Sequence, residues 1–544
     1  MNRYLLPIVL LLAACSEAPP PPAPAKSEVA SAEKAESTQL PEAPATEAAI
    51  RAEDLAAQIQ ILASDEFAGR QPGGPGERKT VAYLTREFQR LGLAPGNAGT
   101  YVQEVPMIEI TSEATGPLKI DYADGTSDSL VIGEEAVVQT LREDPRVDVA
   151  MSDLVFVGFG VNAPELNWND YADIDVKGKT VVVLVNDPGF ETGDADLFRG
   201  KAMTYYGRWT YKYEEALRQG AAAALIVHDD AGAAYGWEVV RNSFGGAEFD
   251  LPSTAGAEQP LAIRGWITSA AAARIFGKLG LDFAALRSAA NVPGFKAKAL
   301  DAKASMGVTS SVRKAKSSNV VGILPGSETP EEVIIFTAHW DHLGRNFQTP
   351  DDGIFNGAVD NATGVAAMLE LAEAFAKGPT KPKRSLMFLS VTLEESGLLG
   401  SKHYVQNPLV PLKQTVATVN MDAIQVIGKT RDVIVIGYGN SELEDILRRH
   451  AEAQGRLIVP EPTPENGFYY RSDHFNFARA GVPSLYAKNG IDHVEKGEAY
   501  GRQLSADYVA RAYHKPADEY DPNWDLSGNV QDAELLYALS RELA

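Results

Sequence analysis

The stretch EEVIIFTAHWDHLG, residues 331–344, decides the fold class of this chain. It begins with the apolar, β-branched run VIIFTA, which is typical of a strand buried on both faces. Two of the eight histidines in the sequence, His339 and His342, follow this run closely, with Asp341 between them. In open parallel sheets, ligands bind beyond the carboxyl ends of the strands. The stretch therefore predicts a buried strand that ends in metal-competent side chains.

Strand-like runs and helical patterns alternate from residue 320 to the C-terminus. The apolar runs cover 385–393, 415–421, 432–437 and 482–487, and helical patterns cover 364–376, 442–453 and 532–543. Continuous Val/Ile/Leu runs separated by amphipathic helices are typical of a sheet covered on both faces. We therefore predict an α/β fold in which a mostly parallel mixed sheet is sandwiched by helices.

Acidic side chains follow the predicted strands. Glu394 and Glu395 end the run SLMFLSVTL, Asp422 follows TVATVNM, and Asp360 precedes a helical pattern. Taken singly, each has a structural explanation as a sheet cap, a solvated turn or a helix N-cap. Together, four acids beside His339 would repel one another unless a cation neutralised them. Such a mixture of nitrogen and oxygen ligands suits zinc.

The sequence before residue 320 divides into two parts. Residues 49–149 carry helical patterns on both sides of a Gly/Pro-rich loop at 69–76, followed by short β-like runs. In residues 150–292, buried strand runs such as GKTVVVLV alternate with helical patterns, which predicts a compact α/β insert. A linking stretch then returns the chain to the main domain, predicted over 293–544.

The N-terminus is typical of a secretory signal. Residues 1–15, MNRYLLPIVLLLAAC, contain one arginine and an apolar stretch too short to span a bilayer. The ending LAAC resembles the lipobox of bacterial lipoproteins, which implies that Cys15 is lipidated and anchors the protein to the membrane. Ser16 after it favours the outer membrane, facing the periplasm. A plain signal with a chance cysteine is the alternative. As Cys15 is the only cysteine, it cannot form a disulfide within the chain.

Residues 16–48 are rich in Pro, Ala and Glu and offer few large apolar side chains, so we predict a disordered linker. The formal net charge of the whole chain is −23, and no basic cluster stands out against it. This charge argues against nucleic acid as a partner.

Six segments of the chain resemble, in order, the motifs of the co-catalytic dizinc aminopeptidases of peptidase clan MH. They are TAHWDHLG, GAVDNATG, EESGLLGS, NMDA, RSDHFNFARAGVP and YHKPADEY. This group also contains glutamate carboxypeptidase II and the transferrin receptors. The resemblance extends from about residue 50 to the C-terminus, and residues 150–292 resemble the protease-associated (PA) domain inserted in many of these enzymes. It implies the zinc exopeptidase fold, with a smaller α/β PA domain inserted.

The resemblance also implies a set of metal ligands. His339, Asp360 and Asp422 would hold one zinc ion, and Asp360, Glu395 and His514 would hold the second, with Asp360 bridging the two. A metal-bound histidine generally needs an orienting partner, and Asp341 matches the carboxylate that orients His339. His342 is assigned to packing or to the rim of the pocket.

Three further residues match positions that act on the substrate. Glu394 matches the general base, which takes a proton from a water bridging the two zinc ions and passes it to the leaving amine. Arg471 and Tyr513 match residues that contact the substrate and stabilise the tetrahedral intermediate.

The function implied is that of a zinc aminopeptidase acting on peptides with a free N-terminus. A carboxypeptidase or dipeptidase of the same family is an alternative, and Arg471 alone does not decide between them. A catalytically silent receptor is a second alternative, which the intact ligand set disfavours. A mononuclear zinc cyclotransferase is a third, and the presence of Asp360, Glu395 and Asp422 counts against it.

Overall fold

The computed structural model describes residues 49–244, 246–253, 259–346 and 352–544. Among the helices of these ranges, none has the length and apolar character needed to cross a membrane. The predicted signal segment 1–15, with Cys15, and the predicted linker 16–48 lie outside the described residues. Both therefore stay predictions.

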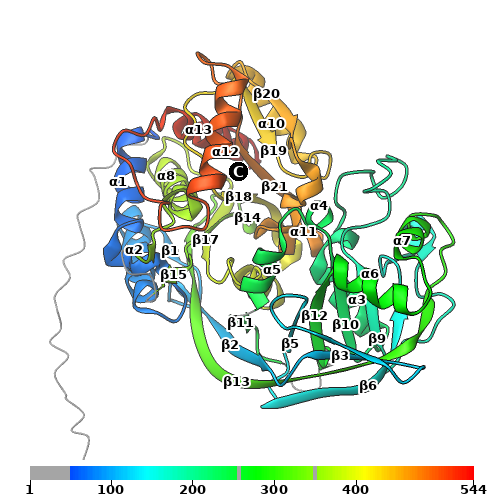
Figure 1. Cartoon of the computed structure of the whole chain (residues 1–544). Helices are drawn as coiled ribbons and strands as arrows, with labels where there is room; N and C mark the ends of the chain where they lie inside the picture. Colours follow the sequence, from blue (N-terminus) through cyan, green and yellow to red (C-terminus); the bar gives the residue numbers. More distant parts are fainter. Residues whose placement is uncertain (1–48, 245, 254–258, 347–351) are drawn as a thin grey trace, which may run out of the picture. The chain divides into compact units, whose positions relative to one another are not determined.

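A mixed sheet forms the centre of the C-terminal half of the chain (Figure 1). Its central strands are parallel and lie in the order β17 (Arg384–Val391), β14 (Thr329–His339), β18 (Thr415–Asn420) and β21 (Ser484–Asn489). At the two sides, β13 (Lys298–Leu324) pairs antiparallel with β17, and β19 (Asp432–Val435) pairs antiparallel with β21 and parallel with β20 (Leu457–Pro460). The predicted mostly parallel mixed sheet is confirmed.

Helices cover both faces of this sheet. Successive side chains of a strand point to opposite faces, and in β14 Phe336 contacts Phe375 of α8 (Thr363–Lys377). Its neighbour Ile335 instead clusters with Tyr404 of α9 (Leu399–Gln406) and Phe477 of α11 (His474–Arg479). On the α8 side, that helix packs with α1 (Ala52–Leu62), α2 (Pro75–Leu91) and α13 (Ser527–Leu543). The sheet is therefore sandwiched by helices, as predicted.

The helix α12 (Glu498–Arg511) has no counterpart among the predicted helices. Only Gly501 of its residues is buried, so its sequence lacks the apolar periodicity that marks a packed helix. The helix matters for the site because the chain leaves it directly before Tyr513 and His514.

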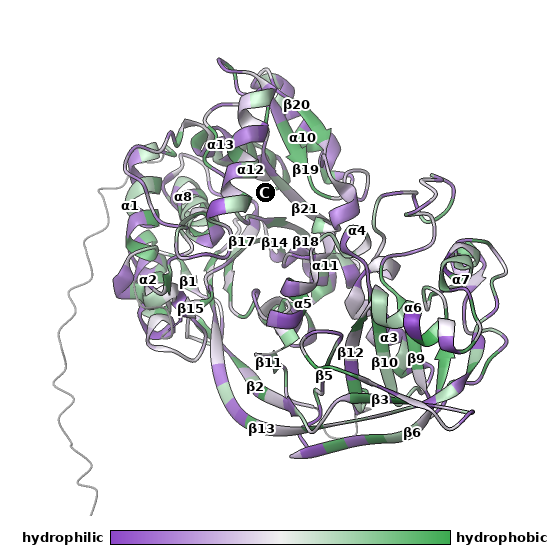
Figure 2. Ribbon diagram, viewed as in Figure 1, coloured by the Kyte–Doolittle hydropathy of each residue, from purple (hydrophilic) through white to green (hydrophobic). Residues whose placement is uncertain are grey.

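A second set of parallel strands lies largely in the region predicted to be an insert. β6 (Arg146–Phe156), β9 (Thr180–Leu184), β10 (Ala223–His228) and β12 (Ile263–Thr268) are parallel neighbours, and β5 (Ala136–Gln139) pairs antiparallel with β12. The helices α3 (Trp209–Arg218) and α6 (Ser269–Lys278) pack on β10 and β12. Apolar side chains of these strands form clusters separate from that around Tyr404, and Figure 2 shows β9 and β10 as largely hydrophobic. The domain boundaries 49–149, 150–292 and 293–544, and the PA identity of the insert, stay predictions.

The stretch interpreted as a link between the insert and the main domain is one strand of 27 residues, β13. It pairs antiparallel with β2 (Val102–Ala114), β3 (Leu118–Tyr122) and β6, and then with β17 (Figure 1). Its mixture of Lys, Ala and Ser hides the strand signal, because burial alternates regularly only over residues 299–306 and none of the side chains of residues 309–316 is buried.

Glu370 of α8 is a buried acid with a perturbed pKa. Its side chain accepts hydrogen bonds from Gln58 Nε2 at 3.0 Å and from the Arg51 N–H at 3.4 Å. Burial raises the pKa of Glu370 to about 8, and the neighbouring Asp54 and Glu373 carboxylates add to this effect. A glutamate of the unfolded chain titrates near 4.5. The folded state therefore binds the Glu370 proton more tightly than the unfolded state does. The stability that this proton binding contributes is lost as the pH rises from about 4.5 to about 8.

Glu370→Gln is expected to remove this pH dependence, because glutamine keeps an acceptor but carries no titrating proton. The unfolding free energy of the variant minus that of wild type should be about 2–4 kcal/mol larger at about pH 9 than at about pH 5, because one pKa unit corresponds to about 1.4 kcal/mol. Chemical unfolding at the two pH values measures the difference. An unfolding free-energy difference that is the same at both pH values would contradict the raised pKa.

Candidate metal centre

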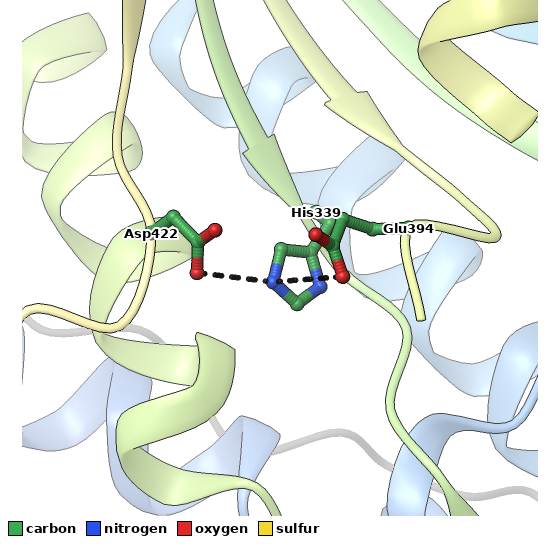
Figure 3. Close-up of side chains that lie close together, drawn as sticks. All are labelled: His339, Glu394 and Asp422. Atoms are coloured by element: carbon green, nitrogen blue, oxygen red, sulfur yellow. Dashed lines mark hydrogen bonds and ion pairs between the residues drawn. The ribbon is translucent and has the colours of Figure 1, made fainter. Parts of the chain in front are cut away.

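Three neighbouring strands bring metal-competent side chains to one edge of the sheet. His339 is the last residue of β14, Glu394 and Glu395 follow the end of β17, and Asp422 follows the end of β18. Since β17, β14 and β18 are adjacent and parallel, their carboxyl ends meet at this edge. Figure 3 shows His339 between Asp422 and Glu394. The convergence predicted from the sequence is therefore present in the structure.

Asp360 lies between two histidines. It occupies the irregular turn Ala358–Ala362 that precedes α8. Its Oδ1 is 3.3 Å from His339 Nε2, and its Oδ2 is 3.2 Å from His514 Nε2. The backbone N–H groups of Val359 and Asp360 donate to the two carboxylate oxygens of Asp518, at 3.0 and 3.1 Å. The Asp360 carboxylate is thus held where it faces both histidines.

A first group of possible ligands surrounds His339. Its Nε2 is 3.4 Å from Asp422 Oδ1 and 3.9 Å from Glu394 Oε2 (Figure 3). Asp422 and the shared Asp360 thus approach His339 more closely than Glu394 does. Ligand atoms of His339, Glu394 and Asp422 all lie within 4.8 Å of one another, a spacing that suits a metal ion.

A second group surrounds Glu395. Its Oε2 is 3.2 Å from His514 Nε2, and its Oε1 is 2.6 Å from His342 Nδ1. The interpretation of His342 as a packing or rim residue misses this bond to a predicted ligand. His342 is 1% exposed, and its ring meets that of His514 edge-on, with centroids 5.8 Å apart. The sequence signal that could have indicated this contact is the position of His342, three residues after His339 in the same loop.

Asp341 contacts His339 and Glu394. The Nδ1 atom of His339 is 3.2 Å from the backbone oxygen of Asp341 and 3.8 Å from its Oδ1. A proton on Nδ1 donated to that backbone oxygen would leave the lone pair of Nε2 available to a metal ion. Oδ1 of Asp341 also accepts a bond from the Glu394 N–H at 3.2 Å. The backbone oxygen of Asp341, rather than the carboxylate that the resemblance indicates, is thus the hydrogen-bond partner of His339, and the carboxylate instead fixes the backbone of Glu394.

Burial makes the charges of this cluster costly. Burial raises the pKa of Glu394 well above its usual value. The positive charge of His339 opposes this rise, whereas the nearby Asp422 and Glu395 carboxylates add to it. Burial would also raise the pKa of Asp360, but the bonds to His339 and His514 hold that pKa well below the ordinary range. The cluster thus depends on positive charge among its acids.

The donor set fits zinc. Imidazole nitrogens and carboxylate oxygens are ordinary zinc ligands, and Asp360 offers one oxygen to each side of the cluster. Two buried atoms at the rim of the cluster, Asp341 Oδ2 and His342 Nε2, have no hydrogen-bond partner among the described residues. These atoms and the crowded acids are consistent with a cation in the centre of the group.

The two predicted substrate-binding residues differ in their surroundings. Tyr513 stacks on His514, with ring centroids 4.0 Å apart, and its side chain remains 41% exposed, so it stands beside the candidate centre. Arg471 lies over the Phe468 ring, 5.5 Å from its centroid. Its Nε and Nη2 atoms are buried without a hydrogen-bond partner among the described residues. The structure therefore joins Tyr513 to the cluster directly, whereas Arg471 is a half-buried cation whose described ring contact is Phe468.

The fold and this cluster define an α/β protein with a candidate metal centre at the edge of its sheet. Residues 319–538, which carry the whole cluster, match the model of peptidase family M28. This match supports the resemblance seen in the motifs over residues 319–538. The PA domain and the lipidated Cys15 stay predictions.

Individual relatives are similar over limited segments. "Aminopeptidase NAALADL1" of Mus musculus is 35% identical over 111 residues, which are 20% of this chain and 13% of the relative. "Glutamate carboxypeptidase 2 homolog" of Caenorhabditis elegans is 34% identical over 128 residues, 23% of this chain and 15% of the relative. The chain thus spans a small part of these curated relatives. The solved structure "Aminopeptidase from Aneurinibacillus sp. strain AM-1" aligns with 91% of this chain and 94% of its own at 22% identity, with a TM-score of 0.49.

Proposed function

We propose that this chain is a zinc-dependent exopeptidase that removes N-terminal residues from peptides. The observation that carries the proposal is the Asp360 carboxylate, whose two oxygens face His339 and His514 at a sheet edge crowded with acids. The match of residues 319–538 to a peptidase family supports peptide hydrolysis. The aminopeptidase name of the mouse relative supports attack at the N-terminal bond.

Five residues would hold two zinc ions. His339 and Asp422 would bind one ion, His514 and Glu395 would bind the other, and Asp360 would bridge them. Bound zinc supplies a Lewis acid that polarises the scissile carbonyl and makes a water acidic at neutral pH. The bond between His342 and Glu395 orients that carboxylate, a role comparable to that of Asp341 for His339.

Glu394 is the proposed general base. Its backbone is fixed by Asp341, and its carboxylate lies farther from His339 Nε2 than those of Asp360 and Asp422 do. Glu394 is therefore free to accept the proton of the attacking water and to pass it to the amine that leaves.

Tyr513 is proposed to stabilise the tetrahedral intermediate. Its ring lies on His514, and its exposed side chain is open to a substrate that enters the site. A phenol O–H placed there can donate a hydrogen bond to the oxygen that develops charge.

A dipeptidase or carboxypeptidase is a second candidate, and a pair of arginines favours it. Arg208, directly before α3, lies close enough to Arg471 for the two charges to disfavour one another, and burial together with this repulsion lowers the pKa of Arg208 to about 10. Arg471 has two buried donor atoms without partners among the described residues. Two adjacent cations of this kind suit the C-terminal carboxylate of a short peptide.

The cellular setting is proposed from the N-terminal sequence. Lipidation of Cys15 would anchor the enzyme to the outer membrane with its domains in the periplasm, where it would meet peptides. The charge of −23 disfavours nucleic acid as a partner.

Chelation tests the metal dependence of the proposed reaction. Removal of bound metal is expected to abolish hydrolysis of leucyl and alanyl amides, because the acid cluster then holds no Lewis acid, and added zinc is expected to restore it. Release of the amine, followed by absorbance, measures the rate. A metal-free protein that still cleaves these amides would refute a zinc-dependent function.

A panel of four substrates, namely aminoacyl amides, C-terminally blocked peptides, N-blocked peptides and an unblocked dipeptide, separates the remaining functions. An aminopeptidase cleaves aminoacyl amides and C-terminally blocked peptides but spares N-blocked ones. A carboxypeptidase cleaves N-blocked peptides with a free C-terminus, and a dipeptidase requires both ends free. We expect the aminopeptidase pattern. Turnover that requires a free C-terminal carboxylate would indicate a carboxypeptidase or dipeptidase instead of an aminopeptidase. No turnover of any substrate would indicate a binding protein.

A further inference from the structure

The turn that precedes α2 packs into the backbone of the candidate metal centre. Ala68, Gly69 and Arg70 all have positive φ angles, of 47°, 67° and 51°. A side chain on Gly69 would overlap the carbonyl oxygens of Gly344 and Phe355, so only glycine allows this approach. The turn lies some 270 residues before the end of β14. It nevertheless packs closely against the segment that follows β14 and the segment that precedes Asp360.

The Arg70 side chain joins these segments. Its Nε donates to Trp340 O at 2.9 Å, its Nη1 donates to Leu62 O at 2.7 Å and Asn356 O at 2.6 Å, and its Nη2 donates to Gly357 O at 2.8 Å. Trp340 is the residue between His339 and Asp341, and Gly357 is three residues before Asp360. One rigid planar group thus fixes the distance between the two backbone segments that supply both sides of the cluster.

The charge of Arg70 has no carboxylate directly bonded to it, since its four described acceptors are neutral backbone oxygens. The side chain is 1% exposed. Burial lowers the pKa of Arg70 to about 10, and the carboxylates of Asp518, Asp360, Asp341 and Glu395 oppose this change. At neutral pH the guanidinium therefore stays charged and offsets part of the negative charge of the cluster.

We infer that Arg70 is a positioning residue of the metal centre, which holds the loop of His339 and Asp341 at a fixed distance from the loop of Asp360. This inference rests on the proposed zinc site. It assigns a functional role to a residue that lies outside the region matched to peptidase family M28. It also explains why a turn so distant in sequence carries a buried arginine rather than an apolar side chain.

Two substitutions test the inference. Arg70→Lys keeps the charge but loses the planar fork, and Arg70→Gly removes the side chain at a φ angle that glycine adopts readily. Both variants are expected to bind zinc about 10- to 100-fold more weakly and to lose kcat by a similar factor with little change in KM. Added guanidinium at millimolar concentration is expected to restore part of the zinc affinity of Arg70→Gly. Competition with a chromogenic chelator measures the affinity without reference to activity.

Arg456→Lys is the matched control. Arg456 is also 1% exposed and bonds to Thr430, Asp432 and Asp532, none of which belongs to the metal centre. Its replacement should lower thermal stability and leave zinc affinity unchanged. If Arg70→Lys behaves in the same way, with a lower Tm but wild-type zinc affinity and kcat, the inference is overturned. If the wild-type protein itself binds no zinc, the proposed function fails instead. Should Arg70→Gly not fold, Arg70→Lys alone decides.

Discussion

Glu394→Gln is expected to lower kcat for peptide hydrolysis by about 10²- to 10⁴-fold, the range typical of a lost general base. Glutamine has nearly the shape of glutamate but cannot accept the proton of the attacking water. The zinc content should not change, because the five proposed ligands remain and Glu394 is the most distant of the three acids that face His339 Nε2. Glu394→Ala should show the same loss. Steady-state kinetics and metal analysis of one preparation measure both quantities.

The control for this substitution is Glu534→Gln, which changes an exposed glutamate of α13 and should leave both quantities at their wild-type values. Near-normal activity of Glu394→Gln would remove Glu394 from the role of base. A simultaneous loss of zinc would instead indicate that Glu394 is a metal ligand. The distances among His339, Glu394 and Asp422 also permit that assignment.

Asp360→Asn is expected to remove zinc from both positions and to abolish turnover. The two oxygens of Asp360 face different histidines, and the amide nitrogen of asparagine cannot replace an anionic oxygen on either side. Asp422→Asn, by contrast, should weaken only the position beside His339. Metal content after dialysis against zinc-free buffer distinguishes the two results, with a greater loss expected for Asp360→Asn.

The matched control is Asp445→Asn, on the exposed face of α10 (Leu443–Ala453), which should keep the wild-type content. If Asp360→Asn and Asp422→Asn lose the same amount of zinc, Asp360 does not bridge two ions. The two positions would then have to be assigned separately.

The sheet and most of the candidate centre follow from local sequence patterns. Long apolar runs predict the strands, and because parallel strands end at one edge, the residues after three runs predict His339, Glu394, Glu395 and Asp422 as neighbours. Asp360 is marked by the helix that follows it. His514 carries no such mark, because α12 is mostly exposed, and only the resemblance to a known family indicated it.

Other parts of the site depend on contacts between distant segments. The bonds of Arg70 to Trp340 and Gly357 and those of Asp518 to the turn of Asp360 join residues more than a hundred positions apart. An isolated arginine or aspartate in a sequence is usually solvated, so burial of either cannot be predicted from its neighbours. The 27-residue strand β13 was equally hidden, since its partners β2, β3 and β6 lie far upstream.

X-ray diffraction from crystals of the zinc-loaded protein, recorded at the zinc absorption edge, tests the central claim most directly. The account predicts two anomalous peaks on either side of the Asp360 carboxylate, one beside His339 and Asp422 and the other beside Glu395 and His514, at about 2.0–2.3 Å from their ligand atoms. The absence of peaks at this edge of the sheet, or peaks bound by other residues, would contradict it.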